Sequence, residues 1–238
     1  MATPLSDLTR MPDPQFVMSA DGFRIATYSW GEDTQPAVVL VHGFASSTRD
    51  NWVNTGWVRD LQREGYRILA LDQRGHGLSD KPLDARDYEL SMLARDVENV
   101  MDTYLVDSAS YIGYSLGARV GWEVAKDLQD RLTKVVLGGV PDGVPLGRLD
   151  LDQVQALVDH GTPVTDTVTM NYLQLMERVE GNDVRALLAI AGGMRASGAA
   201  DPDPAQAPAQ EILFATGSLD GIIEGSRALA SASPRGRF

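Results

Sequence analysis

Short apolar runs alternate with amphipathic segments along the first 140 residues or so of the chain. The apolar runs predict buried strands, because strands covered on both faces of a parallel sheet are apolar at nearly every position. The segments between them repeat apolar residues at three- and four-residue steps, which is the spacing of an amphipathic helix. Strands are predicted at 15–18, 23–28, 37–41, 66–71, 109–112 and 132–137, and helices at 52–63, 92–105 and 116–128. Such alternation predicts an α/β fold with a mostly parallel sheet flanked by helices.

The alternation stops near residue 143. Three helical patterns follow without a strand between them, at 151–158, 164–179 and 183–191. A proline-containing segment at 201–208 leads back to a predicted strand at 211–216 and a helix at 221–230. We therefore expect an α/β core formed by residues 1–143 and 210–238, with residues 144–209 as an inserted helical cap.

Composition and charge exclude several classes of function. The formal net charge of −12 at pH 7 disfavours nucleic acids and anionic membranes as partners. The chain has no cysteine, which excludes disulfides, thiolate metal sites and a cysteine nucleophile. Neither an apolar signal core nor a membrane-length apolar run of roughly 18 residues is present. We expect a cytoplasmic protein that does not bind membranes.

The clearest chemical signal is Gly113-Tyr114-Ser115-Leu116-Gly117, which lies between a predicted strand and a predicted helix. A serine on such a sharp turn has a strained backbone and an exposed hydroxyl, which is typical of a nucleophile. The N–H of Leu116 is then placed to stabilise an oxyanion. The flanking glycines allow neighbouring backbone segments to approach closely.

Two further loops follow predicted strands. His42-Gly43-Phe44 comes directly after the strand at 37–41, and we expect the Phe44 N–H to be the second oxyanion donor. The His42 side chain is expected to order this loop. The loop at 72–80, which contains Arg74 and Asp80, is expected to be a hydrogen-bonded turn and to take no direct part in chemistry.

Asp220 follows the strand predicted at 211–216 and is the candidate acid of a catalytic triad. A carboxylate there can accept the Nδ1–H of a histidine and fix its tautomer. The alternative role for Asp220 is to cap the helix that begins at Gly221. Asp142 is the other candidate acid.

Together these motifs resemble the α/β-hydrolase superfamily, in its branch of small capped serine esterases. The matching residues are 42–44 with Trp52, 72–80, 113–117 and 217–220. The resemblance implies an α/β-hydrolase fold with an eight-stranded sheet, a triad in the order Ser…Asp…His, and no cofactor or metal. We call the turn at 113–117 the elbow. A serine in the elbow argues against haloalkane dehalogenases and epoxide hydrolases, which use an aspartate there.

The histidine that the resemblance places after Asp220 is absent. All three histidines of the chain, His42, His76 and His160, precede it. We expect His160 to be a surface or core residue. We also expect the last strand and helix to be missing, which would leave the strand at 211–216 as an unpaired sheet edge. Such an edge favours self-association.

The sequence therefore predicts a serine hydrolase that cleaves small-molecule carboxylic esters through an acyl-enzyme. Its candidate residues are Ser115 as nucleophile, Asp220 as acid, and the N–H groups of Phe44 and Leu116 as the oxyanion hole. Without a histidine after Asp220, we expect impaired turnover. A carbon–carbon bond hydrolase or lactonase on the same scaffold, and a non-catalytic ligand-binding homologue, are the alternatives.

Overall fold

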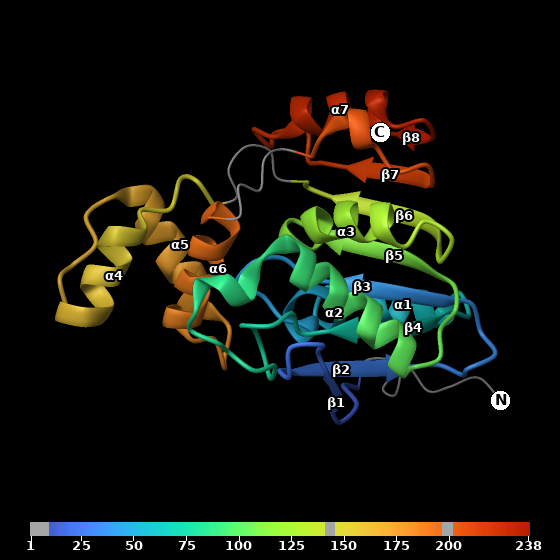
Figure 1. Ribbon diagram of the computed structural model, residues 1–238, viewed down its shortest axis with the longest axis horizontal. Coiled ribbons are helices and arrows are strands. Elements are labelled where there is room, and N and C mark those ends of the chain that lie inside the picture. Colours follow the sequence, from blue (N-terminus) through green and yellow to red (C-terminus); the bar gives the residue numbers. More distant parts are fainter. Residues whose placement is uncertain (1–9, 141–145, 197–201) are drawn as a thin grey trace.

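A single mixed sheet forms the centre of the computed structural model, which describes residues 10–140, 146–196 and 202–238 (Figure 1). The strand order is β1-β2-β4-β3-β5-β6-β7-β8. β1 pairs antiparallel with β2, and β2 with β4, whereas all other neighbours pair parallel. The strands are β1 (Gln15–Met18), β2 (Arg24–Trp30), β3 (Ala37–Val41), β4 (Arg67–Leu71), β5 (Ala109–Tyr114), β6 (Leu132–Gly138), β7 (Glu211–Ala215) and β8 (Gly236–Arg237).

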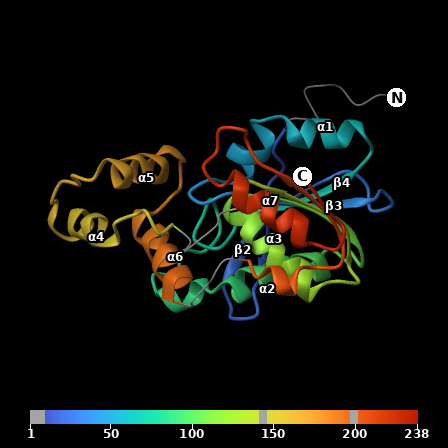
Figure 2. The same ribbon diagram turned by 90° about the horizontal axis from the view of Figure 1, so that it is seen from above.

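Helices cover the two faces of this sheet unequally. α1 (Trp57–Arg63) lies on one face, and α2 (Leu90–Thr103) and α3 (Leu116–Asp127) lie on the other (Figure 2). α7 (Ile223–Ala232) packs beside β7 and β8. The connections also contain a π-helix, η1 (Arg49–Val53), and two 3-10 helices, η2 (Ala85–Tyr88) and η3 (Pro204–Gln206).

One predicted helix is divided in two. The sequence indicates a continuous helix at 52–63, but the structure has η1 up to Val53 and starts α1 at Trp57. Gly56 between them has a φ of 89°, a left-handed conformation that glycine adopts without a steric penalty. The prediction of one helix is wrong because η1 ends at Val53 with Asn54 as its C-cap, and Gly56 is the N-cap from which α1 starts.

The larger of two apolar clusters lies between the sheet and helices α2 and α3, and the smaller one includes Val58 of α1. Tyr111, Leu137 and Phe214 point into the larger cluster from β5, β6 and β7 and are at most 1% exposed. Trp122 of α3 packs against Phe214, with ring centroids 6.4 Å apart. On the opposite face, Leu213 is 45% exposed. The sheet is therefore closed on one face and partly open on the other, beyond the reach of α1.

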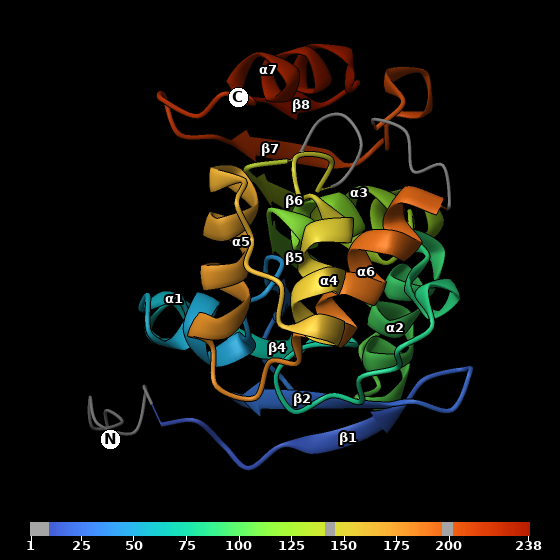
Figure 3. The same ribbon diagram turned by 90° about the vertical axis from the view of Figure 1, so that its left-hand side faces the viewer.

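In the described part of the chain between β6 and β7 there are three α-helices, which we call the helical insertion: α4 (Leu151–His160), α5 (Thr167–Arg178) and α6 (Val184–Ala196). Asp150 and Asp166 cap the first two, because their carboxylates accept hydrogen bonds from the N–H groups of Gln153 and Thr169. The insertion lies against the ends of the strands, with α5 between α1 and β7 in the view of Figure 3.

The prediction of an unpaired strand at 211–216 is wrong. β8 adds to the sheet beside β7, with Gly236 opposite Ile212 and Arg237 opposite Leu213. Two residues are too few to give a strand pattern in the sequence. Gly236 allows this pairing, because a side chain there would overlap the Ala230 carbonyl oxygen. Self-association through the sheet edge stays a prediction, and the edge concerned is now β8.

Candidate active site

Ser115 sits in a strained turn between β5 and α3. Its φ of 51° and ψ of −113° lie outside the regions that side-chain-bearing residues favour. The turn is held because the Ser115 N–H donates to the Gly138 carbonyl oxygen of β6 at 2.8 Å. Strain that the surrounding structure maintains in this way is concentrated at functional sites in proteins.

Close backbone contacts on both sides of Ser115 require glycine. A side chain at Gly117 would overlap the Val41 carbonyl oxygen at the end of β3, and one at Gly113 would overlap the Gly117 carbonyl oxygen. The buried Tyr111 hydroxyl donates to that same Gly117 oxygen at 2.6 Å. The first turn of α3 is thereby pressed against the ends of β3 and β5, which directs Ser115 away from the sheet.

Two backbone N–H groups beside Ser115 are free to bind a ligand. Among the described residues, neither the Phe44 N–H nor the Leu116 N–H has a hydrogen-bond partner. The Gly43 N–H is bound by Asn51 Oδ1 at 3.0 Å, which fixes the loop between β3 and η1. A Cβ atom at Gly43 would lie 3.3 Å from the Ser115 Cβ, so this loop lies directly against the elbow. The geometry suits the predicted pair of donors.

His42 and His76 are buried, and their ring nitrogens already form hydrogen bonds within the protein. His42 Nε2 accepts from the Gln73 N–H at 3.0 Å, and its Nδ1 lies 2.8 Å from the Gly43 carbonyl oxygen. His76 Nε2 accepts from the Ala45 N–H at 3.0 Å. Burial lowers the pKa of both imidazoles, and that of His76 falls well below its ordinary value. Both rings are neutral and order the loop after β3, as predicted for His42, so neither has a free nitrogen to act as a base.

The other candidate triad members, His160 and Asp220, are not among the residues that line the pocket with Ser115. His160 is an exposed residue at the end of α4. Asp220 is exposed, and its Oδ1 accepts from the Ile222 N–H at 3.2 Å in the turn before α7. That contact resembles the capping role given above as its alternative. Asp142 lies outside the described residues. The acid role of Asp220 stays a prediction.

The loop at 72–80 is a structural turn, as expected. Asp72 is 2% exposed and accepts hydrogen bonds from the N–H groups of Thr48 and Leu78 and from the Tyr28 hydroxyl. Ser79 links the loop to β2, because its Oγ accepts from the Ala26 N–H at 2.8 Å. These bonds fix the loop that carries His76.

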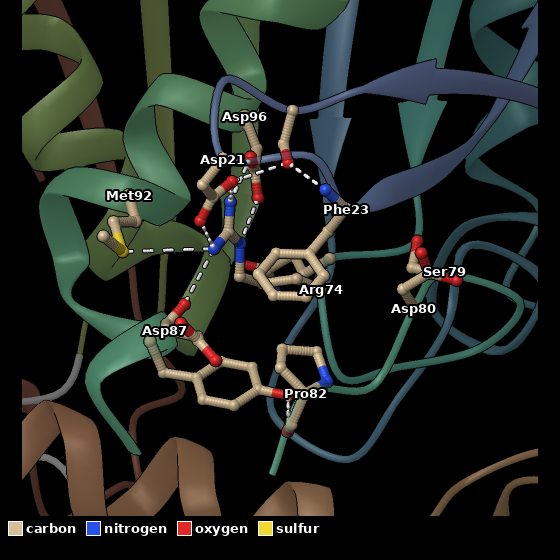
Figure 4. Close-up of polar contacts among 12 residues, drawn as sticks. Asp21, Phe23, Arg74, Ser79, Asp80, Pro82, Asp87, Met92 and Asp96 are labelled. Atoms are coloured by element: carbon tan, nitrogen blue, oxygen red, sulfur yellow. Dashed lines mark hydrogen bonds and ion pairs between the residues drawn. The ribbon is translucent and has the colours of Figure 1, made fainter. Parts of the chain in front are cut away.

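Arg74 of the same loop joins three separate parts of the core (Figure 4). Its guanidinium binds both carboxylate oxygens of Asp96 on α2 at 2.7 Å. It also binds Asp21 in the β1–β2 turn at 2.7 and 2.9 Å, and the Asp87 carbonyl oxygen at 2.8 Å. The Arg74 side chain is 1% exposed and that of Asp96 is 3% exposed. We call Arg74, Asp21 and Asp96 the arginine clip.

A pocket of about 870 Å³ opens beside Ser115. Apolar side chains from α1, β6 and α5 line it, including Trp57, Val136 and Leu175. Asp50 and Arg178 are its charged residues, and neither carries a sequence signal that would have identified it. No histidine of the chain is among the lining residues, and Asp220 is not among them either. The pocket combines a nucleophile candidate, free N–H donors and an apolar wall.

Comparison with known proteins identifies relatives over about half of the chain. The chain is 32% identical over 130 residues to AB hydrolase superfamily protein YfhM of Bacillus subtilis, covering 53% of this chain and 43% of that protein. It is 39% identical over 106 residues to epoxide hydrolase B of Mycobacterium tuberculosis, covering 44% of this chain and 29% of that protein. The chain thus matches less than half the length of these relatives.

Solved structures extend the similarity to almost the whole chain. The enol-lactonase of Burkholderia xenovorans superposes with a TM-score of 0.73 at 21% identity, covering 94% of this chain and 90% of that one. Residues 36–162 match the family described as alpha/beta hydrolase fold, and this segment contains β3, the elbow and the loops around it. With the sheet, the elbow and this match in agreement, the chain belongs to the alpha/beta hydrolase family.

Proposed function

We propose that this protein is a serine hydrolase of small-molecule carboxylic esters that works through an acyl-enzyme. The observation that carries the proposal is the strained backbone of Ser115, held between Gly113 and Gly117 in the lining of the pocket. The epoxide hydrolases among the relatives do not change it, because the chain has serine where the resemblance assigns those enzymes an aspartate.

In the proposed reaction, Ser115 Oγ attacks the ester carbonyl carbon and its proton passes to a base. The carbonyl oxygen becomes negatively charged and accepts hydrogen bonds from the Phe44 and Leu116 N–H groups, which have no described partner of their own. The alcohol leaves, and water then hydrolyses the acyl-enzyme. The helical insertion acts as a cap, because Leu175 and Arg178 of α5 complete the wall of the pocket.

None of the three histidines of the chain is placed to act as the base. The ring nitrogens of His42 and His76 are already hydrogen-bonded in the core, and His160 does not line the pocket. Loss of one core triad member lowers turnover by roughly 10⁴–10⁶, while oxyanion stabilisation and binding retain about 10³–10⁴ over water. We therefore propose slow, Ser115-dependent hydrolysis with water or hydroxide as the proton acceptor.

The test combines kinetics with covalent labelling. Hydrolysis of 4-nitrophenyl butyrate and labelling by a fluorophosphonate, located by peptide mass spectrometry, are compared in the wild type, Ser115→Ala and Ser110→Ala. Ser110 is a matched control because it lies on the same strand and bonds Thr133. Ser115→Ala should abolish both signals, and Ser110→Ala should retain them. Unchanged turnover in Ser115→Ala refutes the nucleophile.

A lactonase is the second candidate, favoured by the similarity to the enol-lactonase. A lactone is a cyclic ester, so the same serine and N–H donors serve, and the leaving hydroxyl stays attached to the acyl group. Comparing a lactone with an open ester of equal carbon number, in the wild type and Ser115→Ala, separates the two substrate classes. Ligand binding without any Ser115-dependent turnover would favour a non-catalytic binding protein instead.

A further inference from the structure

The pocket beside Ser115 contains one pair of opposite charges. Asp50 in η1 and Arg178 in the last turn of α5 are the only charged residues among its described lining. Arg178 Nη2 lies 2.7 Å from Asp50 Oδ2. This ion pair links the helical insertion to the core at the wall of the pocket, and the remaining lining is apolar or uncharged.

The two partners are held unequally. Asp50 Oδ2 also accepts from the Ser46 hydroxyl at 3.0 Å, and the Asp50 N–H donates to Ser47 Oγ at 3.1 Å. Arg178 has five N–H donors, and Asp50 is its one partner among the described residues. Its side chain is 59% exposed, against 31% for Asp50. Arg178 can therefore turn toward a ligand, whereas Asp50 is fixed in its loop.

Replacing the contact between Arg178 and Asp50 with a contact between Arg178 and a ligand costs little free energy. Solvent-exposed ion pairs contribute little to stability, and Asp50 keeps its hydrogen bond from Ser46 when Arg178 turns away. A ligand carboxylate can take two parallel N–H bonds from a guanidinium, a geometry that one Nη2 contact to Asp50 does not use. The apolar neighbours Trp57, Val136 and Leu175 suit a hydrocarbon chain.

We propose that Arg178 is the carboxylate-binding residue of this pocket, and that the preferred substrates are monoesters of dicarboxylic acids. The proposal rests on the ester-hydrolase function above. The free carboxylate binds Arg178, the hydrocarbon chain lies along the apolar wall, and the ester reaches Ser115. A cationic ligand fits less well, because it would have to bind Asp50, which Ser46 and Ser47 already hold in its loop, whereas the Arg178 guanidinium is free to reorient toward an anion.

Binding is measured separately from turnover, in protein that carries Ser115→Ala. Isothermal titration compares the mono-4-nitrophenyl ester of adipic acid with 4-nitrophenyl hexanoate, which has the same number of acyl carbons and no free carboxylate. Arg178→Gln should weaken binding of the adipate ester about tenfold and change the hexanoate ester less than twofold. Asp50→Asn should tighten binding of the adipate ester.

Arg185→Gln is the matched control, because Arg185 is an exposed arginine of the same insertion that does not line the pocket. It should leave both affinities unchanged, which excludes a general effect of net charge. Equal effects of Arg178→Gln on the two esters, or none on either, overturn the proposal. Tighter binding of a trimethylammonium ester that depends on Asp50 also overturns it.

Turnover in protein with Ser115 intact distinguishes the two proposals. If hydrolysis depends on Ser115 but shows no preference for the adipate ester, the carboxylate site is wrong and the hydrolase stands. If the binding preference depends on Arg178 but no ester is hydrolysed, the binding site stands and the hydrolase is wrong. Circular dichroism of each variant verifies that it is folded.

Discussion

Replacing Arg74 with methionine tests the arginine clip most directly. The change keeps much of the apolar stem of the side chain but removes five N–H···O contacts, two to Asp96, two to Asp21 and one to the Asp87 carbonyl oxygen. Asp96, at 3% side-chain exposure, is left as a buried carboxylate without a cation. Asp21 is 31% exposed and can be solvated by water. The cost therefore comes mainly from Asp96.

Removing one partner of a buried ion pair costs about 3–5 kcal/mol, and we expect Arg74→Met to lower the free energy of unfolding by that amount at pH 8. Burial already raises the pKa of Asp96, and Arg74 opposes the rise, so Arg74→Met raises this pKa further. When a carboxyl group has a raised pKa in the folded state, the free energy of unfolding of the protein falls as the pH rises through that pKa. The loss of free energy of unfolding in Arg74→Met, relative to the wild type, should consequently be smaller at pH 5 than at pH 8.

Urea denaturation followed by tryptophan fluorescence measures the effect, since the chain has four tryptophans. Arg59→Met is the control, because the Arg59–Asp60 pair is exposed and its loss should not shift the midpoint measurably. Arg74→Met/Asp96→Leu removes both buried charges and should recover most of the loss. A loss below about 1 kcal/mol in Arg74→Met, or no recovery in the double variant, would show that the Arg74–Asp96 pair does not stabilise the fold as expected.

Three further predictions concern the elbow and the loop beside it. Ser115→Gly should abolish fluorophosphonate labelling yet raise the free energy of unfolding by about 1 kcal/mol. The reason is that relief of about 1–3 kcal/mol of backbone strain exceeds the effect of the added entropy of the unfolded chain. A urea midpoint below that of the wild type would contradict this. Gly117→Ala should cost more than about 2 kcal/mol, since the new Cβ would lie 2.7 Å from the His42 carbonyl oxygen, whereas Gly221→Ala meets nothing within 4 Å and serves as the control. Neutral, buried His42 and His76 have lowered pKa values, so they contribute stability above pH 6.5 that is lost as the pH falls below it; equal urea midpoints at pH 7.5 and 5.5 would contradict this.

Local patterns were sufficient to predict the core of this fold. The apolar run 37–41 and the glycine-flanked Ser115 carry their structural role in adjacent residues, and the structure has a strand and a strained turn at these places. The same holds for the three helices of the insertion, whose bounds were predicted to within a few residues except at the C-terminus of α6. Periodicity and turn chemistry act over short distances, so one sequence is enough to detect them.

Features that depend on distant partners were not predictable. Arg74 was recognised as a turn residue, but its bonds to Asp21 and Asp96 join segments that meet only after the sheet has formed. The pairing of Asp50 with Arg178 likewise depends on how the insertion packs against η1. β8 was missed because pairing of two residues leaves no alternation to detect. In each case tertiary packing, and not local propensity, decides the structure.

The backbone amides at and beside the elbow differ in hydrogen bonding, so deuterium exchange can report on the site. The Ser115 amide is bonded to Gly138 between two central strands, so it should exchange only when β5 and β6 separate. The Phe44 and Leu116 amides have no described partner and should exchange far faster. A ligand anion that fills the oxyanion site would slow exchange of these two amides and leave that of Ser115 unchanged, which would reveal occupancy of the site without a turnover assay.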